Sequence, residues 1–303
     1  MAIGYYLTVG VFMGIFSILT ISLNILTGYA KQVSLGHAAF FGIGAYTSAM
    51  LTTNYGLTFW QALPCVIIIT AFIGTLLGLP SLRVSHDFLV LSTIGLNFIV
   101  GGVFRYFSFF GGSMGIIGVP PPRMFGSPLG NMGYFLLTLA FLILTILTSY
   151  YFSKTWGRLA MEAMGEDEIA AKSMGINVPK FKTYAFALSS AYAGIAGALW
   201  AHYVGSVFPG NFSFDRSVAI LSMLVFGGMG TIRGALLGAF LLRLFPELFR
   251  FIQDYRMLVY GGILVVMIRF QPMGLLGKGS VLWNGLEWFA RKIRGGPIQE
   301  GTT

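Results

Sequence analysis

The sequence predicts an all-α integral membrane protein, a polytopic helical bundle of about 8–10 transmembrane helices with broken or re-entrant segments. Of its 303 residues, 56% are hydrophobic and only 10% are charged, and the mean hydropathy is +0.79. Soluble domains carry roughly 25% charged residues. Long uncharged runs also recur, as in residues 60–80 and 134–152. A helix needs about 20 apolar residues to cross the hydrocarbon core, where its backbone must satisfy its own hydrogen bonds.

Hydropathy and turn residues divide the chain into expected spans. These lie near residues 5–27, 36–53, 60–80, 88–108, 134–152, 183–204, 216–230, 234–250 and 256–270. The first run is too long for the core of a signal peptide and has no basic residue before it, so we interpret it as a span. The seventh run is short, and Arg243 and Glu247 interrupt the eighth. Residues 1–277 are expected to form one membrane domain, followed by a C-terminal tail over 278–303.

The distribution of basic residues predicts the orientation of the spans. If the polar segment 154–182 is cytoplasmic, thirteen Lys and Arg lie inside and five lie outside. The inside group is Lys31, Arg83, Lys154, Arg158, Lys172, Lys180, Lys182, Arg233, Arg269, Lys278, Arg291, Lys292 and Arg294, and the outside group is Arg105, Arg123, Arg216, Arg250 and Arg256. Because basic loops stay in the cytoplasm, the N-terminus is expected outside and the C-terminal tail inside. The net charge of +9 then reflects orientation, and no nucleic-acid partner is expected.

The 41 glycines predict close helix packing and irregular backbone. Pairs four residues apart place small residues on one helix face, where two backbones can approach. These pairs are Gly10 and Gly14, Gly74 and Gly78, the series Gly230, Gly234 and Gly238, and Ser190, Gly194 and Ala198. Two segments rich in glycine and polar residues, 34–46 and 226–234, predict broken or re-entrant pieces. Such backbone is tolerated at membrane depth only inside the protein or along a water-filled path.

The chemistry-bearing residues do not form a catalytic or metal pattern. His37, His86 and His202 stand on separate elements, and the single cysteine, Cys65, lies in an apolar run. No glycine-rich loop ends in Gly-Lys-Ser/Thr, so we expect no ATP site of the P-loop kind and no bound metal or cofactor. Proton- or sodium-coupled carriers usually place carboxylates in their spans. Glu247 alone qualifies, and Arg243 stands one turn away as an ion-pair partner.

The polar segment 154–182 is the strongest functional clue. It holds five Lys or Arg and four Asp or Glu between two apolar runs. Glu166, Asp167 and Glu168 favour the start of a short helix, and Glu168 stands four residues before Lys172, the better orientation for a pair. Gly175 suits a left-handed residue after the helix end, and Pro179 prevents its continuation. A capped amphipathic helix at this place is typical of a docking element, although an idle connector remains the alternative.

At these residues the chain resembles the permeases of ABC importers. Glu168-x-Ala170-Ala171-x3-Gly175 matches their E-A-A-x3-G pattern. The blocks GRLAMEAMGEDEIAAKSMGIN (157–177), SLGHAAFFGIGAYTSAML (34–51), RVSHDFLVLSTIGLNFI (83–99), VFGGMGTIRGALLGA (225–239) and RFQPMGLL (269–276) are similar to the LivM-type permease family of branched-chain amino acid importers, in the order found there. The chain departs from this family at Ser85-His86-Asp87-Phe88, where Gly-Asp-Tyr is common, and in its short N-terminus.

The resemblance implies a heteromeric importer in the bacterial inner membrane. Its other parts would be a second LivH-type permease, two ABC ATPase subunits that bind ATP and Mg²⁺, and a periplasmic substrate-binding protein. The family's ATPase-coupling helix would fall on Gly157, Arg158, Glu162, Glu166, Asp167, Glu168, Ala170, Ala171, Lys172 and Gly175. The chain itself would be a non-catalytic subunit that carries branched-chain or related amino acids.

Three questions stay open at the level of sequence. Urea and short-chain amide importers use related permeases, so the substrate is not settled. A secondary carrier that works without an ATPase is an alternative from another class, but it has no need of a coupling helix. The polar residues expected to line the translocation path are Asn24, His37, Ser92, Thr93 and Asn97, although each could instead form a hydrogen bond between helices.

Overall fold

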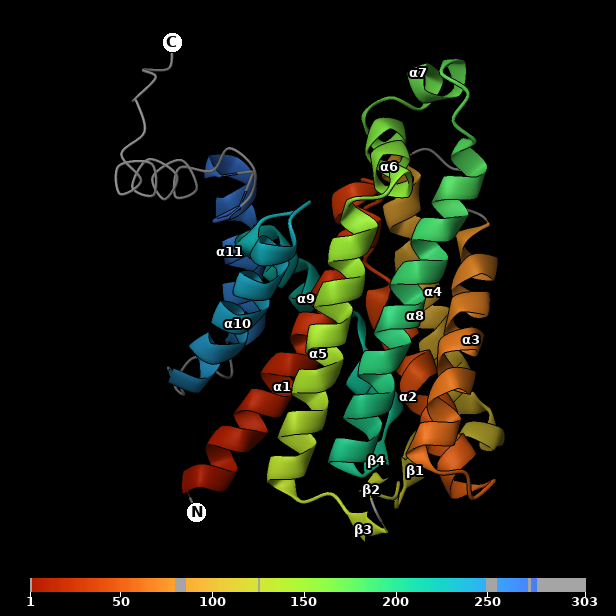
Figure 1. Ribbon diagram of the computed structural model, residues 1–303, viewed down its shortest axis with the longest axis vertical. Coiled ribbons are helices and arrows are strands. Elements are labelled where there is room, and N and C mark those ends of the chain that lie inside the picture. The colour runs from red at the N-terminus through yellow and green to blue at the C-terminus, as the bar shows by residue number, and fades with distance from the viewer. Residues whose placement is uncertain (1, 80–85, 125, 249–254, 272–273, 277–303) are drawn as a thin grey trace.

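The computed structural model describes residues 2–79, 86–124, 126–248, 255–271 and 274–276. A helix lies at each predicted span. These helices are α1 (Ala2–Leu23, continued by the π-helix η1, Asn24–Tyr29), α2 (His37–Thr53), α3 (Phe59–Gly78), α4 (His86–Tyr106), α5 (Asn131–Ser153), α8 (Val178–Val204), α9 (Phe214–Gly227), α10 (Ile232–Leu248) and α11 (Arg256–Phe270). Two further helices, α6 (Trp156–Glu166) and α7 (Glu168–Ser173), join α5 to α8 (Figure 1). The prediction of an all-α polytopic fold is confirmed.

Length separates these helices into two groups. Five are long and apolar enough to cross a membrane: α1 with η1, α3, α4, α5 and α8. The helices α2, α9, α10 and α11 have between 14 and 17 residues. Several predicted features fall outside the described residues, namely Arg83, Arg250 and the tail 278–303, as does the side chain of Glu247.

Two of the long helices form the centre of the bundle. In α1 and α8, 78% of the most apolar window is buried, against 22% to 28% in α3, α4 and α5. Helix α8 packs against α2 and α3, and α1 packs against α5, α8 and α10. A helix that is apolar on every side can be covered by protein or by lipid. Protein covers α1 and α8, whereas α3, α4 and α5 keep large exposed apolar faces.

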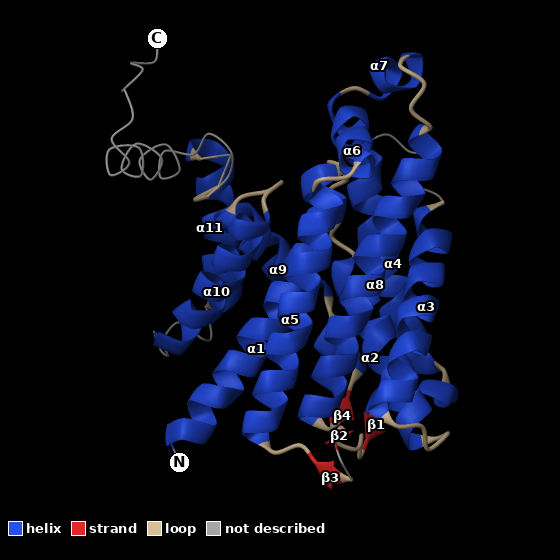
Figure 2. Ribbon diagram, viewed as in Figure 1, coloured by secondary structure: helices blue, strands red, loops and turns tan. Residues whose placement is uncertain are grey.

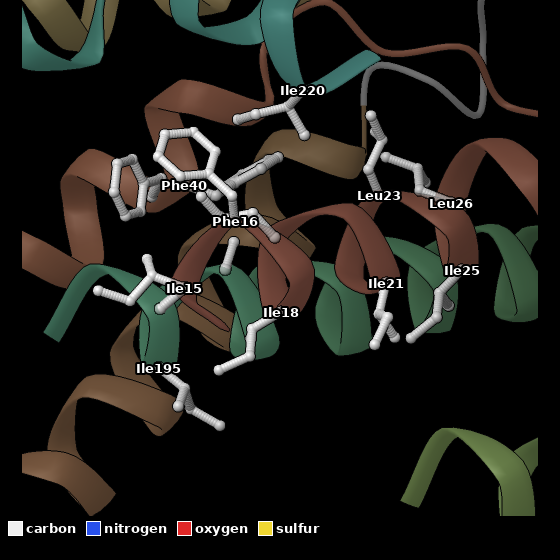
Figure 3. Packing of buried hydrophobic residues seen from close by; sticks show 14 of the residues in the cluster. Ile15, Phe16, Ile18, Ile21, Leu23, Ile25, Leu26, Phe40, Ile195 and Ile220 are labelled. Carbon is white, nitrogen blue, oxygen red and sulfur yellow. The ribbon is translucent and has the colours of Figure 1, made fainter. Parts of the chain in front are cut away.

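The core lies along α1, where large aliphatic residues contact several other helices. Figure 3 shows Ile15, Phe16, Ile18 and Ile21 of α1 beside Phe40 of α2, Ile195 of α8 and Ile220 of α9. All of these side chains are at most 8% exposed. Dense packing of this kind replaces the hydrophobic effect as the main attraction between helices in lipid.

Glycines allow the closest helix contacts, as the sequence predicted. A Cβ on Gly10 or Gly14 of α1 would meet Phe135 or Thr138 of α5. A Cβ on Gly74 of α3 would overlap the Ser190 side chain of α8. Each glycine therefore lies at a helix–helix contact within this chain, consistent with the small-residue rule for membrane helices.

The two predicted breaks in the helices are present, one of them shorter than expected. Helix α9 ends at Gly227, Gly228 and Gly230 have positive φ (125° and 76°), and α10 begins at Ile232. The expectation of irregular backbone over 34–46 is confirmed only as far as Gly36, since α2 is regular from His37. Gly36 allows the chain to lie against the Thr93 carbonyl, because a Cβ there would overlap its oxygen. The residues that follow are mostly buried and form a regular helix.

The end of the bundle away from α6 and α7 carries short strands that the sequence did not predict. Strand β1 (Ile116–Ile117) pairs antiparallel with β4 (Ser206–Val207), and β2 (Arg123–Met124) pairs with β3 (Ser127–Pro128). Figure 2 shows these strands at the same end as the N-terminus, with α6 and α7 at the other. Short 3₁₀ turns accompany them: η3 (Ser108–Phe110), η4 (Gly112–Met114) and η5 (Pro209–Phe212).

Candidate functional site

The predicted coupling segment forms two helices at one end of the bundle. Helix α6 buries Ala160, Met161 and Met164 and leaves Trp156 and Leu159 exposed. The short helix that the sequence predicted to start at Glu166–Glu168 is α7. The coupling helix that the family resemblance implied from Gly157 to Gly175 is divided into two helices, because the chain breaks at Asp167 in an extended conformation (φ −151°, ψ 112°). The break turns α7 away from α6, so each helix presents its own face (Figure 1).

Both ends of α7 are capped as the sequence predicted. The Asp167 carboxylate accepts hydrogen bonds from the N–H groups of Ile169 (2.8 Å) and Ala170 (3.0 Å). Gly175 has a φ of 81°, and it donates its N–H to the Lys172 carbonyl (3.0 Å). The Ile176 N–H reaches the Ala171 carbonyl (3.0 Å), which completes a Schellman motif. A helix of six residues is too short to be stable alone, so these caps and its contacts hold it.

An ion pair fixes α7 to α8. Glu168 pairs with Lys182, whose side chain is only 7% exposed. The sequence suggested Lys172 as the partner of Glu168, but Lys172 lies on the exposed face of α7. Helix α8 begins at Val178, five residues earlier than predicted, because Asn177 accepts a hydrogen bond from the Lys180 N–H (3.1 Å) and Pro179 fits the first turn. This early start brings Lys182 under α7.

A second ion pair joins the end of α6 to the end of the first span. Glu166 pairs with Lys31 at 2.5 Å, and the Glu166 side chain is 72% exposed. Lys31 has a φ of 51°, a left-handed conformation that is uncommon outside glycine. Gly165 lets α6 approach this turn, since a Cβ there would lie 2.9 Å from the Lys31 side chain. Helix α6 therefore rests on the chain where it leaves η1.

A third set of contacts fixes the start of α6 to the same place. The Arg158 guanidinium donates to Glu162 (3.0 Å from Nε) and to the Ser153 carbonyl (3.2 Å). It also lies over the Tyr29 ring, 5.1 Å from the centroid. Tyr29 is the last residue of η1 and is 2% exposed. Cation–π contact and hydrogen bonds thus fix Arg158 between α5, α6 and the first span.

The π-helix η1 meets the broken connection between α9 and α10. The Asn24 side-chain oxygen accepts a hydrogen bond from the Gly230 N–H (2.8 Å). Gly28 allows this approach, because a Cβ there would lie 2.6 Å from the Gly230 nitrogen. The chain near its other end also reaches the break, since Leu275 and Leu276 donate to the carbonyls of Phe226 and Gly227 (3.0 and 2.9 Å). Three segments far apart in sequence are therefore joined near α6: η1, the connection between α9 and α10, and residues 275–276.

The remaining predicted coupling residues divide between packing and surface. Ala171 is 4% exposed and faces the bundle, whereas Ala170 and Lys172 are exposed. Gly157 is partly buried at the start of α6. The most exposed apolar side chains of the segment are Ile169 (78%) and Met174 (83%), which the sequence analysis did not single out. Large apolar residues within this polar segment are the sequence signal that could have identified them.

Four of the five predicted path residues are buried between helices. His37 lies 2.9 Å from the Ser22 hydroxyl, and Thr93 accepts from the Leu35 N–H (3.1 Å). Asn97, with its amide oriented to suit its neighbours, donates to the Phe212 carbonyl (3.2 Å) and accepts from the Phe214 N–H (3.3 Å). Each of these contacts joins different segments of the chain.

Ser92 is the exception among the path residues. It is exposed on α4, and its hydroxyl donates only to its own helix, to the carbonyls of Phe88 and Leu89. A cavity of about 470 Å³ opens between α2, α3 and α4, and its apolar lining includes none of the five predicted residues. Asn24, His37, Thr93 and Asn97 therefore form hydrogen bonds between segments in this structure, and their place along the path stays a prediction.

Three serines outside the predicted set connect the same region. Ser22 donates to the Ser189 carbonyl (2.6 Å), and Ser189 donates back to the Ser22 carbonyl (2.8 Å), which joins α1 to α8. Ser217 accepts from the Ala38 N–H (2.9 Å), which joins α9 to α2. A serine in an apolar span is a signal for such a contact, because its hydroxyl must find a partner away from water. Among the described residues, no three His, Cys, Asp or Glu gather as metal ligands.

The fold and this site together define a multi-pass membrane permease subunit. Its apolar bundle has a broken connection between α9 and α10, and a polar helical segment is fixed to α8 and to the chain after η1, which contacts that connection. The family model for the branched-chain amino acid transport system permease component matches residues 5–268, so the chain belongs to this family.

Curated relatives from bacteria and an archaeon agree with the family match. The chain is 36% identical over 288 residues to the high-affinity branched-chain amino acid transport system permease protein LivM of Salmonella typhimurium, covering 86% of this chain and 68% of the relative. The LivM protein of Escherichia coli gives the same values. A probable branched-chain amino acid permease, LivH of Methanocaldococcus jannaschii, is 26% identical over 262 residues, or 81% and 82% of the two chains. No solved structure gives a significant match.

Proposed function

We propose that this chain is one of two permease subunits of an ABC importer for branched-chain amino acids in the bacterial inner membrane. Leucine, isoleucine and valine are the substrates suggested by the names of its LivM and LivH relatives. The second permease would be of the LivH type, and a periplasmic binding protein would deliver the substrate. Two ATPase subunits would bind ATP and Mg²⁺ and supply the energy, so this chain performs no catalysis itself.

The observation that carries the proposal is the attachment of α6 and α7 to the centre of the bundle. A force applied to α7 passes to α8 through Glu168 and Lys182. A force on α6 passes to η1 through Glu166 and Lys31. Because η1 contacts the break between α9 and α10, movement of the ATPases would reach irregular backbone within the membrane domain. Hinge-like motion of this kind suits alternating access.

The proposed orientation places α6 and α7 in the cytoplasm. The charge distribution supports it, since most Lys and Arg then lie inside. Residues 1–277 form the membrane domain in this proposal, and 278–303 form a cytoplasmic tail. The path would run between the two permeases, beside the buried side chains of Asn24, His37, Thr93 and Asn97. Separation of the helices there during transport would expose these polar groups to the substrate.

Reconstitution tests the proposal. The chain is incorporated into proteoliposomes with the second permease and the ATPases encoded beside it, and uptake of labelled leucine is measured with the binding protein and ATP. We expect accumulation only when all the components are present. Uptake by this chain alone would indicate a secondary carrier, and uptake of urea or acetamide in place of leucine would contradict the proposed substrate.

A further inference from the structure

A second cavity lies at the α6 end of the bundle, and its lining includes none of the five predicted path residues. Its volume is about 370 Å³, and it opens between the last turn of α5, the start of α6, the end of η1 and the start of α10. Its lining includes Tyr29, Tyr150, Ser153, Arg158 and Arg233. Two arginines from distant parts of the sequence therefore face one small space.

The charge around this cavity is positive. Lys154 stands at its edge, with its ammonium group 4.3 Å from the centroid of the Tyr150 ring. Glu162 lies nearby and accepts hydrogen bonds from Arg158. Among the described residues named here, Arg158, Arg233 and Lys154 against Glu162 give a formal charge of +2. An anion that enters would be attracted by this excess, and Arg158 is already held in place by Tyr29 and the Ser153 carbonyl.

The cavity lies at the level of the lipid headgroups. Tyr150 and Ser153 belong to the last turn of α5, a span of 23 residues with no charged side chain, and the polar segment begins at the next residue. Tyr150, Tyr151 and Trp156 are 48%, 69% and 62% exposed there. Exposed Tyr and Trp mark the membrane–water boundary, and basic pockets between membrane helices bind lipid phosphates.

We propose that this cavity binds the phosphate group of an anionic phospholipid through Arg158 and Arg233. Arginine suits this ligand, because its guanidinium has five N–H donors. Arg158 gives Nε and Nη2 to Glu162 and one Nη1 N–H to the Ser153 carbonyl, which leaves one N–H on each terminal nitrogen for a phosphate oxygen. A bound headgroup would bridge α6 and α10. Helix α6 contacts the end of η1, and α10 begins where the broken connection after α9 ends. The lipid would then influence how α6 rests on the membrane domain.

Lipid-dependent thermal stability of the purified full-length chain tests this site. The melting temperature is measured in detergent while phosphatidylglycerol, phosphatidylcholine or inorganic phosphate is added. The variant is Arg233→Gln, since Arg233 is exposed and its change leaves the packed contacts of Arg158 intact. The control is Arg123→Gln, which removes the same charge from an exposed arginine at the opposite end of the bundle.

We expect phosphatidylglycerol to raise the melting temperature at lower concentration than phosphatidylcholine does. Arg233→Gln should weaken this response roughly fivefold, the factor typical of one basic side chain at an anionic surface, and Arg123→Gln should not. Equal responses to the two lipids, or a wild-type response by Arg233→Gln, would overturn the proposal. A response to inorganic phosphate alone that depends on Arg233 would support phosphate binding but contradict a lipid source.

Discussion

Single residues at the ends of α7 determine whether this short helix forms. Gly175 has a φ of 81°, and nothing lies within 4 Å of the place where a Cβ would stand. The requirement at this position is therefore conformational, because an L-residue pays for a left-handed backbone even in open space. Gly56 has the same property at the opposite end of the molecule, with a φ of 65° and no near neighbour.

We predict that Gly175→Val lowers ATP-driven uptake and ATPase co-purification while membrane insertion stays normal. The strain, about 1–2 kcal/mol, disrupts the end of α7 and moves the segment that follows Ala170. Gly56→Val carries the same strain in a loop away from α7, so it should leave co-purification with the ATPases unchanged. If both variants behave alike, the end of α7 has no special role in coupling.

The two ion pairs that join the segment to other parts of the bundle, Glu168–Lys182 and Glu166–Lys31, should differ in strength. Lys182 is almost covered by protein, so removal of Glu168 leaves a poorly solvated cation. Glu166 and Lys31 form an exposed pair, and such pairs contribute about 0–1 kcal/mol. We predict that Glu168→Ala greatly accelerates hydrogen exchange of the α7 amides, whereas Glu166→Ala changes it little. The double variant Glu168→Leu with Lys182→Met should restore slow exchange, and equal effects of the two single variants would contradict this ranking.

Among the elements, α7 presents a surface that the described part of the chain leaves uncovered. Ile169 is 78% exposed on this polar helix, which the proposed orientation places in the cytoplasm and away from lipid. We predict that Ile169→Asp reduces co-purification of the ATPases at least tenfold, the effect of losing about 1.4 kcal/mol or more from a central apolar contact. Met114→Asp is the matched control, since Met114 is 77% exposed at the other end. Unchanged co-purification by Ile169→Asp would place the ATPase contact elsewhere.

Helices α9 and α10 depend on their glycines for contact. A Cβ on Gly234 would overlap the Gly228 carbonyl, and Gly227 and Gly238 are equally crowded. We predict that Gly234→Leu lowers the melting temperature of the purified chain, because the break between the helices must open to admit the side chain. Gly261→Leu in α11 should be tolerated, because no atom lies within 4 Å of the position that its Cβ would take. A stable Gly234→Leu variant would show that the break adapts to larger residues.

The sequence predicted the elements better than their contacts. Each span was found because lipid demands a long apolar run, and Gly175 was found because few other residues accept its conformation. The partner of Glu168 was missed because it depends on where α8 begins, which Asn177 and Pro179 set by local hydrogen bonding. Strands of two residues are too short to show the alternation of polar and apolar residues that predicts a strand. The π-helix was missed because it differs from an α-helix only in which carbonyl accepts each hydrogen bond.

For the whole molecule, the structure separates two ends along the spans. The N-terminus and the short strands lie at one end, and α6 and α7 lie at the other (Figure 1). We predict that, in a Cys65→Ala background, a membrane-impermeant maleimide labels Ser127→Cys in intact spheroplasts. Ser173→Cys should react only after the membrane is permeabilised, because α7 is expected in the cytoplasm. The reverse pattern would invert the proposed orientation.

The π-helix at the end of the first span gives that span two registers. In an α-helix each residue turns the chain by about 100°, so one residue more or less changes the direction of every side chain that follows. The wide turn between Asn24 and Tyr29 inserts such an offset. Residues before it follow the buried core of α1, and Tyr29 after it reaches the guanidinium of Arg158. Deletion of one residue here would leave a span of nearly the same length and hydropathy that no longer aims its last residues at α6.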